Sequence, residues 1–309
     1  MDIAPDKETG PRGFWGWMQA IDRRVIYVVL FVLLTVCIAV KVPINITPTS
    51  NAYRLFNAVN ECPDDGVILI MGMWGLGTKG ENWPQFEALV YHCLNTGKKF
   101  AVAGNDPISI AVQNQIIESR AADVERRTGR HIVYGRDWVN LGYKQSGGVS
   151  QAAYYVSLAD NVREFFGNRD FKNNDLSKMP IMENIRNAGD FYMVFEVAAG
   201  LDGIYVWVGI IRPKYPNTLY GGAVTAIVAP NAYPYVDSGQ LVALIDGPRG
   251  AAEYEKLIGF EDKGRGHRQA NAQSWAHILI FILLVLGNIG YFVTRHGRDT
   301  RRSRSRGRA

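Results

Sequence analysis

The residues best suited to chemistry form a glycine-rich stretch, Gly75-Leu76-Gly77-Thr78-Lys79-Gly80, directly after an apolar run that predicts a strand. In dinucleotide-binding sites, glycines with this G-x-G-x-x-G spacing let the backbone approach a pyrophosphate at a helix N-terminus. Asp106, after the next predicted strand, stands where an acidic residue would bind a ribose. Two features weaken this interpretation. The next helix is predicted to begin only at Pro84, and the interval from Gly80 to Asp106 exceeds the usual spacing of about 20 residues. A plain glycine-rich loop is favoured.

A second set of candidates follows from position in the predicted sheet. In open α/β sheets, ligands bind beyond the carboxyl ends of the strands. These ends carry groups suited to a small polar ligand: Gly75, Gly77, Gly80, Asn105, Asp106, Lys144, Gly147, Gly148, Glu196 and Asp246. Each also has a structural alternative, which is favoured; Asp106 before Pro107, for instance, is a normal helix N-cap.

Other catalytic chemistry finds no support in the sequence. There is no G-x-S-x-G nucleophile elbow, and no His stands near Ser146 or Ser150. The five His are scattered and no Cys/His ligand set exists, so neither a metal site nor a cofactor is expected. Cys62 and Cys93 flank the first strand; they could pair in an oxidising compartment, but two separate thiols are favoured. No catalytic residue is assigned.

The candidates lie on an alternation of short apolar runs and longer amphipathic segments. Strands are predicted at or within 67–71, 100–103, 139–143, 191–197, 218–227 and 241–245, with a short candidate at 133–134. Helices are predicted at 51–61, 84–95, 107–127, 149–166, 230–236 and 250–258. Residues 204–211 fit a strand by β-branched content and a helix by position. The alternation predicts an α/β fold with a mainly parallel, Rossmann-like sheet covered by helices on both faces.

Two apolar runs flank this domain, which covers residues 45–273. Residues 275–294 contain no charged residue and, at 20 residues, are long enough to cross a hydrocarbon core of about 30 Å. Residues 25–44 are predicted to form a first span, an uncleaved signal anchor, with a cleaved signal peptide as the alternative. The sheet domain is thus predicted to be inserted between two transmembrane helices.

The positive charge of the chain lies in its last residues. The segment 295–309 holds seven Arg and one Asp, a net +6, which leaves −1 for the rest of a chain of net charge +5. Nucleic-acid binding by the central domain is therefore disfavoured. The tail is expected to bind anionic lipid headgroups through Arg295, Arg298, Arg301, Arg302, Arg304, Arg306 and Arg308.

Charge also predicts orientation. Arg23 and Arg24 before the first apolar run, and the basic tail after the second, both favour the cytoplasm under the positive-inside rule. Residues 1–24, with their interfacial aromatics, and residues 295–309 are thus expected in the cytoplasm, and the central domain outside it. In the second run, Asn288 with Gly287 and Gly290 predicts a face that packs against another helix, of this chain, of a second copy or of a membrane-protein partner.

The segments YGRDWVNLGYKQSGG (134–148) and YVDSGQLVALIDGPRGAAEYE (235–255) resemble an uncharacterised family of bacterial membrane-associated proteins. In that family a variant of YGxDYVNLGYxxGG precedes YPYxxSGQLxGLxxGxxGAAEYE. The resemblance spans much of residues 51–258. It implies an α/β domain tethered to a membrane, which places the chain in a bacterial inner (plasma) membrane, and it carries over no catalytic residue.

Three functions remain open. The favoured one is a membrane-anchored binding or interaction module, a subunit of a membrane assembly and more plausibly not an enzyme. The alternative is an extracytoplasmic enzyme, or a domain that binds a small nucleotide- or sugar-like ligand, at the carboxyl edge of the sheet. The sign of an enzyme would be a closed polar pocket containing Asp106, Glu196 or Asp246 with strongly perturbed acidity. A transport or secretion accessory is the third, supported only by Asn288.

Overall fold

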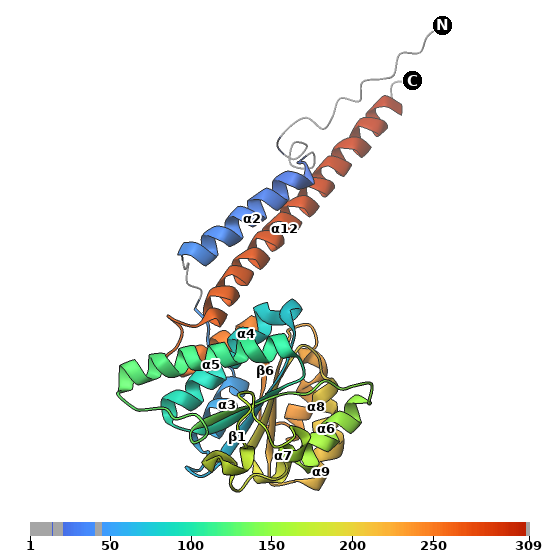
Figure 1. Cartoon of the computed structure of the whole chain (residues 1–309). Coiled ribbons are helices and arrows are strands. Elements are labelled where there is room, and N and C mark those ends of the chain that lie inside the picture. Colours follow the sequence, from blue (N-terminus) through green and yellow to red (C-terminus); the bar gives the residue numbers. More distant parts are fainter. Residues whose placement is uncertain (1–13, 15–20, 41–44, 307–309) are drawn as a thin grey trace. The chain divides into compact units, whose positions relative to one another are not determined.

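A computed structural model describes Phe14 and residues 21–40 and 45–306 (Figure 1). The chain divides into two compact units. Unit 1 combines Met1–Ile44 with Asn271–Ala309, and unit 2 is Asn45–Ala270. Most of the predicted interfacial segment 1–24, the end of the predicted first span and the last three residues lie outside the described residues.

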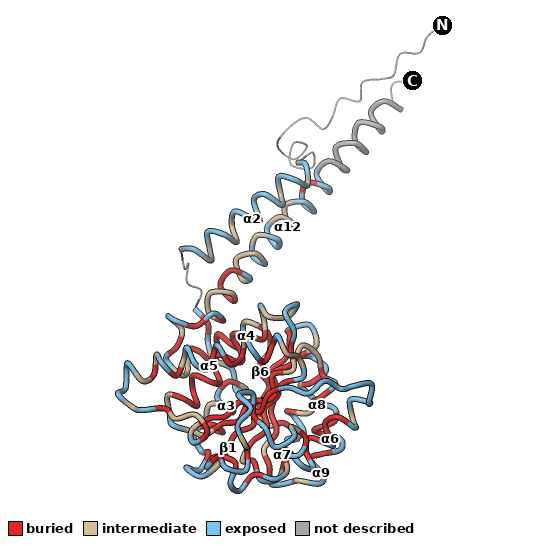
Figure 2. The backbone as a smooth tube through the Cα atoms, viewed as in Figure 1, coloured by how far each residue is buried: buried red, intermediate tan, exposed pale blue. Residues whose placement is uncertain are grey.

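Unit 2 is built on a six-stranded, all-parallel sheet with the strand order β3-β2-β1-β4-β5-β6. The strands are β1 (Val67–Met73), β2 (Lys99–Gly104), β3 (Trp138–Tyr143), β4 (Met193–Ala198), β5 (Leu219–Val224) and β6 (Leu244–Asp246). Figure 2 shows that they are almost entirely buried, as expected for a parallel sheet covered on both faces. The predicted parallel, Rossmann-like α/β fold is confirmed.

Helices cover both faces because alternate strand residues point to opposite sides. Ile68 and Ile70 of β1 belong to one core, with the helices α3 (Ser50–Asn60), α4 (Lys79–Thr96), α5 (Pro107–Thr128) and α11 (Gly247–Leu257). Leu69 and Met71 belong to the other core. Its helices are α6 (Gln151–Asp160), α7 (Val162–Phe165), α8 (Asp202–Val206), the π-helical turn η5 (Trp207–Ile211), and α10 (Tyr233–Asp237); α9 (Arg212–Lys214) follows η5. The strand order reverses between β1 and β4, which makes their carboxyl ends the switch point of the sheet.

Helix α4 begins at Lys79 and not at Pro84, so the predicted start is wrong. Pro84 lacks the N–H that would bond to the Gly80 carbonyl, but tertiary contacts hold the preceding turn in helical form. Glu81 accepts from the Ala226 N–H at 2.8 Å, and Asn82 donates to the Ala198 carbonyl at 2.9 Å. Gly80 consequently lies in the first turn of the helix.

Three other segments differ from expectation. Residues 204–211 are helical, because a crossover between the parallel strands β4 and β5 has to run back across the sheet. The predicted helix 149–166 is split at Asn161, which has a non-helical backbone and caps α7 by accepting from the Glu164 N–H. Residues 133–134 form no strand; Tyr134 makes a single bridge to Trp138.

Two further helices are α2 (Arg23–Val40) and α12 (Arg265–Arg306). Within the described residues, only one helical segment, Arg265–Val293, is long and apolar enough to span a membrane. The apolar part of α2, Arg24–Val36, is shorter than that requirement. Asn288 donates its side-chain N–H to the Leu284 carbonyl of its own helix at 2.9 Å, Gly287 is open to a Cβ, and Gly290 is buried.

Candidate functional site

The glycine-rich loop follows β1 at the switch point, but its glycines are not tightly packed. A Cβ on Gly75, Gly77 or Gly80 would meet no atom within 4 Å. Gly75 has extended backbone angles, φ −104° and ψ −178°, which any residue can adopt. The turn and the close helix–strand packing that dinucleotide sites require of these glycines are therefore not seen around them.

On the α4 side, the strand ends are closed by amide side chains of the protein itself. Gln85 donates to the Val224 carbonyl at 2.8 Å, and Asn82 bonds both Gln85 and the end of β4. Gln113 of α5 donates to the Gly72 carbonyl at 3.0 Å, and a Cβ on Gly72 would fall 2.1 Å from the Gln113 side chain. These bonds occupy the space above the sheet on this face.

A cavity of about 320 Å³ lies at the carboxyl edge on the other face. Its lining comes from the ends of β1, β2 and β3 and from α6: Met73, Asn105, Gln145, Ser146, Gly147, Gln151, Tyr154 and Tyr155. None of these side chains is charged. Two buried tyrosines supply aromatic surface, and the amides and hydroxyls supply hydrogen-bond donors and acceptors. This composition suits an uncharged polar ligand with a ring.

Tyr155 connects the cavity to a buried carboxylate. Its hydroxyl donates to Oε1 of Glu196 on β4 at 2.8 Å, and Glu196 is only 1% exposed. The indole N–H of Trp207 lies near this carboxylate but outside hydrogen-bond geometry. A Cβ on Gly203 would fall 2.2 Å from the Glu196 carboxylate and 2.3 Å from the Tyr155 hydroxyl. A glycine is therefore needed where α8 packs against this pair.

Burial controls the acidity of both partners. Burial raises the pKa of Glu196 to about 7, against the smaller lowering effects of Tyr155 and Trp207. The pKa of Tyr155 lies well above its ordinary value because of burial and the adjacent Glu196. Tyr155 is thus a neutral hydroxyl at physiological pH, whereas Glu196 exchanges a proton in that range.

Apart from Asn105 and Gly147, which line the cavity, the other predicted site residues do not converge. Asp106 caps α5 by accepting from the Ser109 N–H at 2.7 Å. Lys144 donates to the Phe165 carbonyl at 3.0 Å and lies over the Phe165 ring. Asp246 ends β6, at the opposite edge of the sheet from the strand that precedes Lys144. Glu196 is hydrogen-bonded to Tyr155 in the cavity wall. Asp106 is the sequence neighbour of Asn105, which lines the cavity.

Sequence reasoning missed the tyrosines and glutamines of the cavity. It placed Asn105 and Gly147 at the strand ends, but Gln151, Tyr154 and Tyr155 belong to a helix. One signal was available: a helix that closely follows a strand begins at the carboxyl edge of the sheet. The partner of Tyr155, 41 positions away, could not be read from such a rule.

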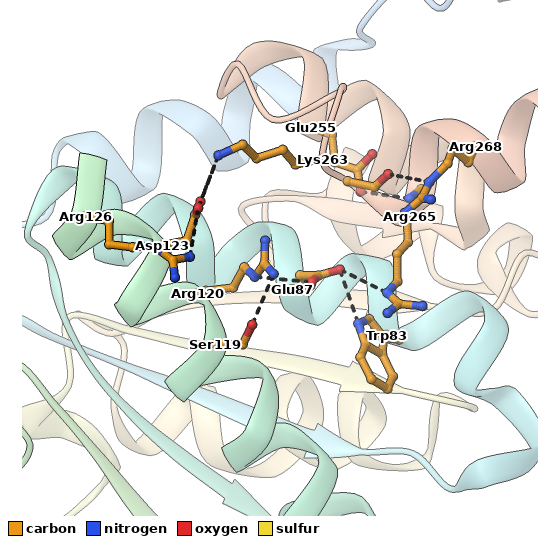
Figure 3. Close-up of polar contacts among 12 residues, drawn as sticks. Trp83, Glu87, Ser119, Arg120, Asp123, Arg126, Glu255, Lys263, Arg265 and Arg268 are labelled. Atoms are coloured by element: carbon orange, nitrogen blue, oxygen red, sulfur yellow. Dashed lines mark hydrogen bonds and ion pairs between the residues drawn. The ribbon is translucent and has the colours of Figure 1, made fainter. Parts of the chain in front are cut away.

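A second polar cluster joins α4, α5 and α11 to the start of α12 (Figure 3). Glu87 lies between Arg120 at 3.6 Å and Arg265 at 3.7 Å, and accepts from the Trp83 indole at 3.2 Å. Burial raises the pKa of Glu87. Nearby, the two oxygens of Glu255 accept from the Gly266 and His267 N–H groups at 2.8 and 2.7 Å. Glu255 of α11 therefore caps α12 from outside that helix.

Side chains of α11 also form hydrogen bonds with the first residues of unit 2. Glu253 accepts from both the N–H and the hydroxyl of Thr49, at 3.1 and 2.6 Å, and Lys256 donates to the Ile46 carbonyl at 2.8 Å. The chain consequently enters and leaves unit 2 at the same helix.

The cysteines and metal-ligating residues form no site in the described part of the chain. Cys62 and Cys93 are buried free thiols, and burial raises the pKa of the Cys62 thiol to about 11. Among the described residues, no group of three or more His, Cys, Asp or Glu is arranged to hold a metal ion. Comparison with protein-family models, curated proteins and solved structures found no match to this chain.

Proposed function

We propose that the protein is a membrane-anchored α/β module that binds a small, uncharged polar ligand at the carboxyl edge of its sheet. The observation that carries this proposal is the uncharged cavity walled by Tyr154 and Tyr155. Its volume of about 320 Å³ lies at the lower end of the range for ligand pockets. A sugar- or nucleoside-like ring, stacked on tyrosine and bonded by amides, fits this size and chemistry.

In the same proposal, residues 25–44 and 275–294 anchor the module in a bacterial plasma membrane, with both tails in the cytoplasm. The apolar length of α12 supports one anchor. Because α11 binds both ends of unit 2, the two connections leave it at one place, which suits two anchors in one membrane. The basic tail would bind anionic lipid headgroups.

The module would act as a subunit of a membrane assembly. Gly287, Asn288 and Gly290 would form the face that packs against another helix, since small residues permit close helix approach in lipid. The bond from Asn288 to its own helix leaves its amide oxygen available for a neighbour.

Native mass spectrometry of the full chain, purified in mild detergent and incubated with neutral monosaccharides and nucleosides, tests the ligand. Gln151→Trp should fill the mouth of the cavity and abolish binding, whereas Gln115→Trp, the same change at an exposed position of α5, should retain it. The proposal is wrong if none of these compounds binds the wild type, or if both variants bind equally well.

A further inference from the structure

The wall of the cavity is fixed by a carboxylate that lies outside the cavity. Tyr155 lines the cavity, and its hydroxyl donates to Glu196, which is not among the lining residues. Gly203 packs closely against both groups, so a larger side chain at this position would displace them. The hydrogen bond with Tyr155 therefore connects Glu196 to the cavity wall.

The surroundings of Glu196 contain donors but no balancing cation. Tyr155 donates a hydrogen bond to it and the Trp207 indole lies nearby, whereas no basic side chain is among the groups that act on its acidity. The other ionisable groups that face the pair are Asp202 of α8 and Tyr154 of α6. Its register neighbours on β1 and β5, Met71 and Gly222, do not ionise.

We propose that Glu196 is a positioning residue that couples the shape of the ligand cavity to a proton. Ionised Glu196 accepts a charge-assisted hydrogen bond from Tyr155, which is stronger than a bond between neutral groups and holds the ring in the cavity wall. Protonation of Glu196 leaves only a bond between neutral groups, which is weaker than the charge-assisted bond. The Tyr155 ring then loses its fixed orientation, and the cavity loses affinity for its ligand.

The direction of the pH effect follows from the acidity of Glu196. Because burial raises its pKa to about 7, the carboxylate is ionised above neutral pH and protonated below it. Ligand affinity should therefore fall as the pH drops through 7. This inference rests on the proposed ligand site, but its central step, the coupling of Glu196 to Tyr155, exists without a ligand.

The test uses the ligand-free full chain in mild detergent, labelled with ¹³C at the tyrosine ζ carbon, and follows its NMR spectrum between pH 5.5 and 8.5. Tyr155 is assigned by the resonance that Tyr155→Phe removes. We expect its chemical shift to change in one step centred near pH 7 in the wild type, and the step to vanish in Glu196→Gln. Asp246→Asn is the matched control, because burial also raises the pKa of this carboxyl group, which likewise lies at the carboxyl end of a strand. This variant should keep the step.

A wild-type Tyr155 resonance that does not titrate, or a step that persists in Glu196→Gln, overturns the inference. If Glu196→Gln does not fold, the Trp207 indole resonance, assigned with Trp207→Phe, supplies a second measurement. Its midpoint should move to higher pH in Tyr155→Phe, because the Tyr155 hydroxyl lowers the pKa of Glu196. An unchanged midpoint contradicts the coupling. The two proposals can be rejected independently. A missing titration step contradicts the coupling but not ligand binding, and a lack of ligand binding contradicts the proposed function but not the coupling.

Discussion

At the scale of single residues, the chain uses buried carboxyl groups for different tasks. Glu196 lies in the centre of the sheet with two neutral donors nearby, whereas Glu87 lies between two arginines. Glu255 accepts two backbone N–H groups. All three are desolvated, which raises their pKa values. Only Glu196 is bonded to a side chain that lines the carboxyl-edge cavity, and this makes it the carboxyl relevant to a ligand.

The space around Glu196 gives a residue-scale prediction. Gly203→Ala would place a methyl group about 2.2 Å from the Glu196 carboxylate, so the variant should be destabilised by about 1–3 kcal/mol, as for other overpacked cores. Denaturant unfolding of the purified full chain measures this free energy. Gly200→Ala is the control, since a Cβ there meets nothing within 4 Å. Equal stability of the two variants would show that Gly203 does not pack against the pair.

At the scale of elements, α11 is the helix that fixes the boundaries of unit 2. It carries Glu253 and Lys256, which bind residues preceding α3, and Glu255, which caps α12. A Cβ on Gly264 would fall 2.2 Å from the Glu255 side chain, so a glycine is required before α12 begins. The first residues of α12, which belong to unit 2, are therefore bonded to α11.

Removal of one acceptor at this cap should weaken the start of α12. Glu255→Gln replaces a carboxylate oxygen by an N–H₂ group that faces a backbone N–H, and an unpaired buried donor costs about 1–3 kcal/mol. Hydrogen exchange should become faster at Gly266 and His267 than elsewhere in unit 2. Glu118→Gln, which removes an exposed ion pair to Lys172, should change little. Unaltered exchange at both amides would mean that Glu255 is not the cap.

At the scale of the whole molecule, our proposal places unit 2 outside the cytoplasm, between two membrane anchors. The proposed orientation rests on charge, because Arg23 and Arg24 and the arginines of the tail would lie in the cytoplasm under the positive-inside rule. The long apolar segment Arg265–Val293 supports one span. The apolar part of α2, Arg24–Val36, is shorter than a membrane span requires.

Insertion of a reporter tests this topology. A phosphatase that is active only outside the cytoplasm should function when inserted after Asn168, an exposed loop residue with φ 54°. The same reporter fused after Ala309 should be inactive. Activity at the second position and not at the first would reverse the proposed orientation.

Much of the fold could be predicted from the sequence because local patterns encode it. Buried parallel strands need continuous apolar runs such as residues 67–71, and the covering helices need amphipathic segments between them. The run 204–211 could not be resolved in this way, because β-branched residues occur in both states and only its place as a crossover makes it helical. The start of α4 was predicted wrongly at Pro84 for a similar reason. Tertiary contacts of Glu81 and Asn82 hold the residues before Pro84 in the helix.

The candidate site depended far more on tertiary structure. By itself, the sequence determined that polar groups follow the strands, that Glu196 lies in an apolar strand, and that the net charge belongs to the tail. Only the fold decided which of these groups meet, since strand order separates Lys144 from Asp246 and brings Tyr155 to Glu196. The tertiary structure also determines the pKa of Glu196, because desolvation depends on the helices packed around a residue and not on its neighbours in the chain.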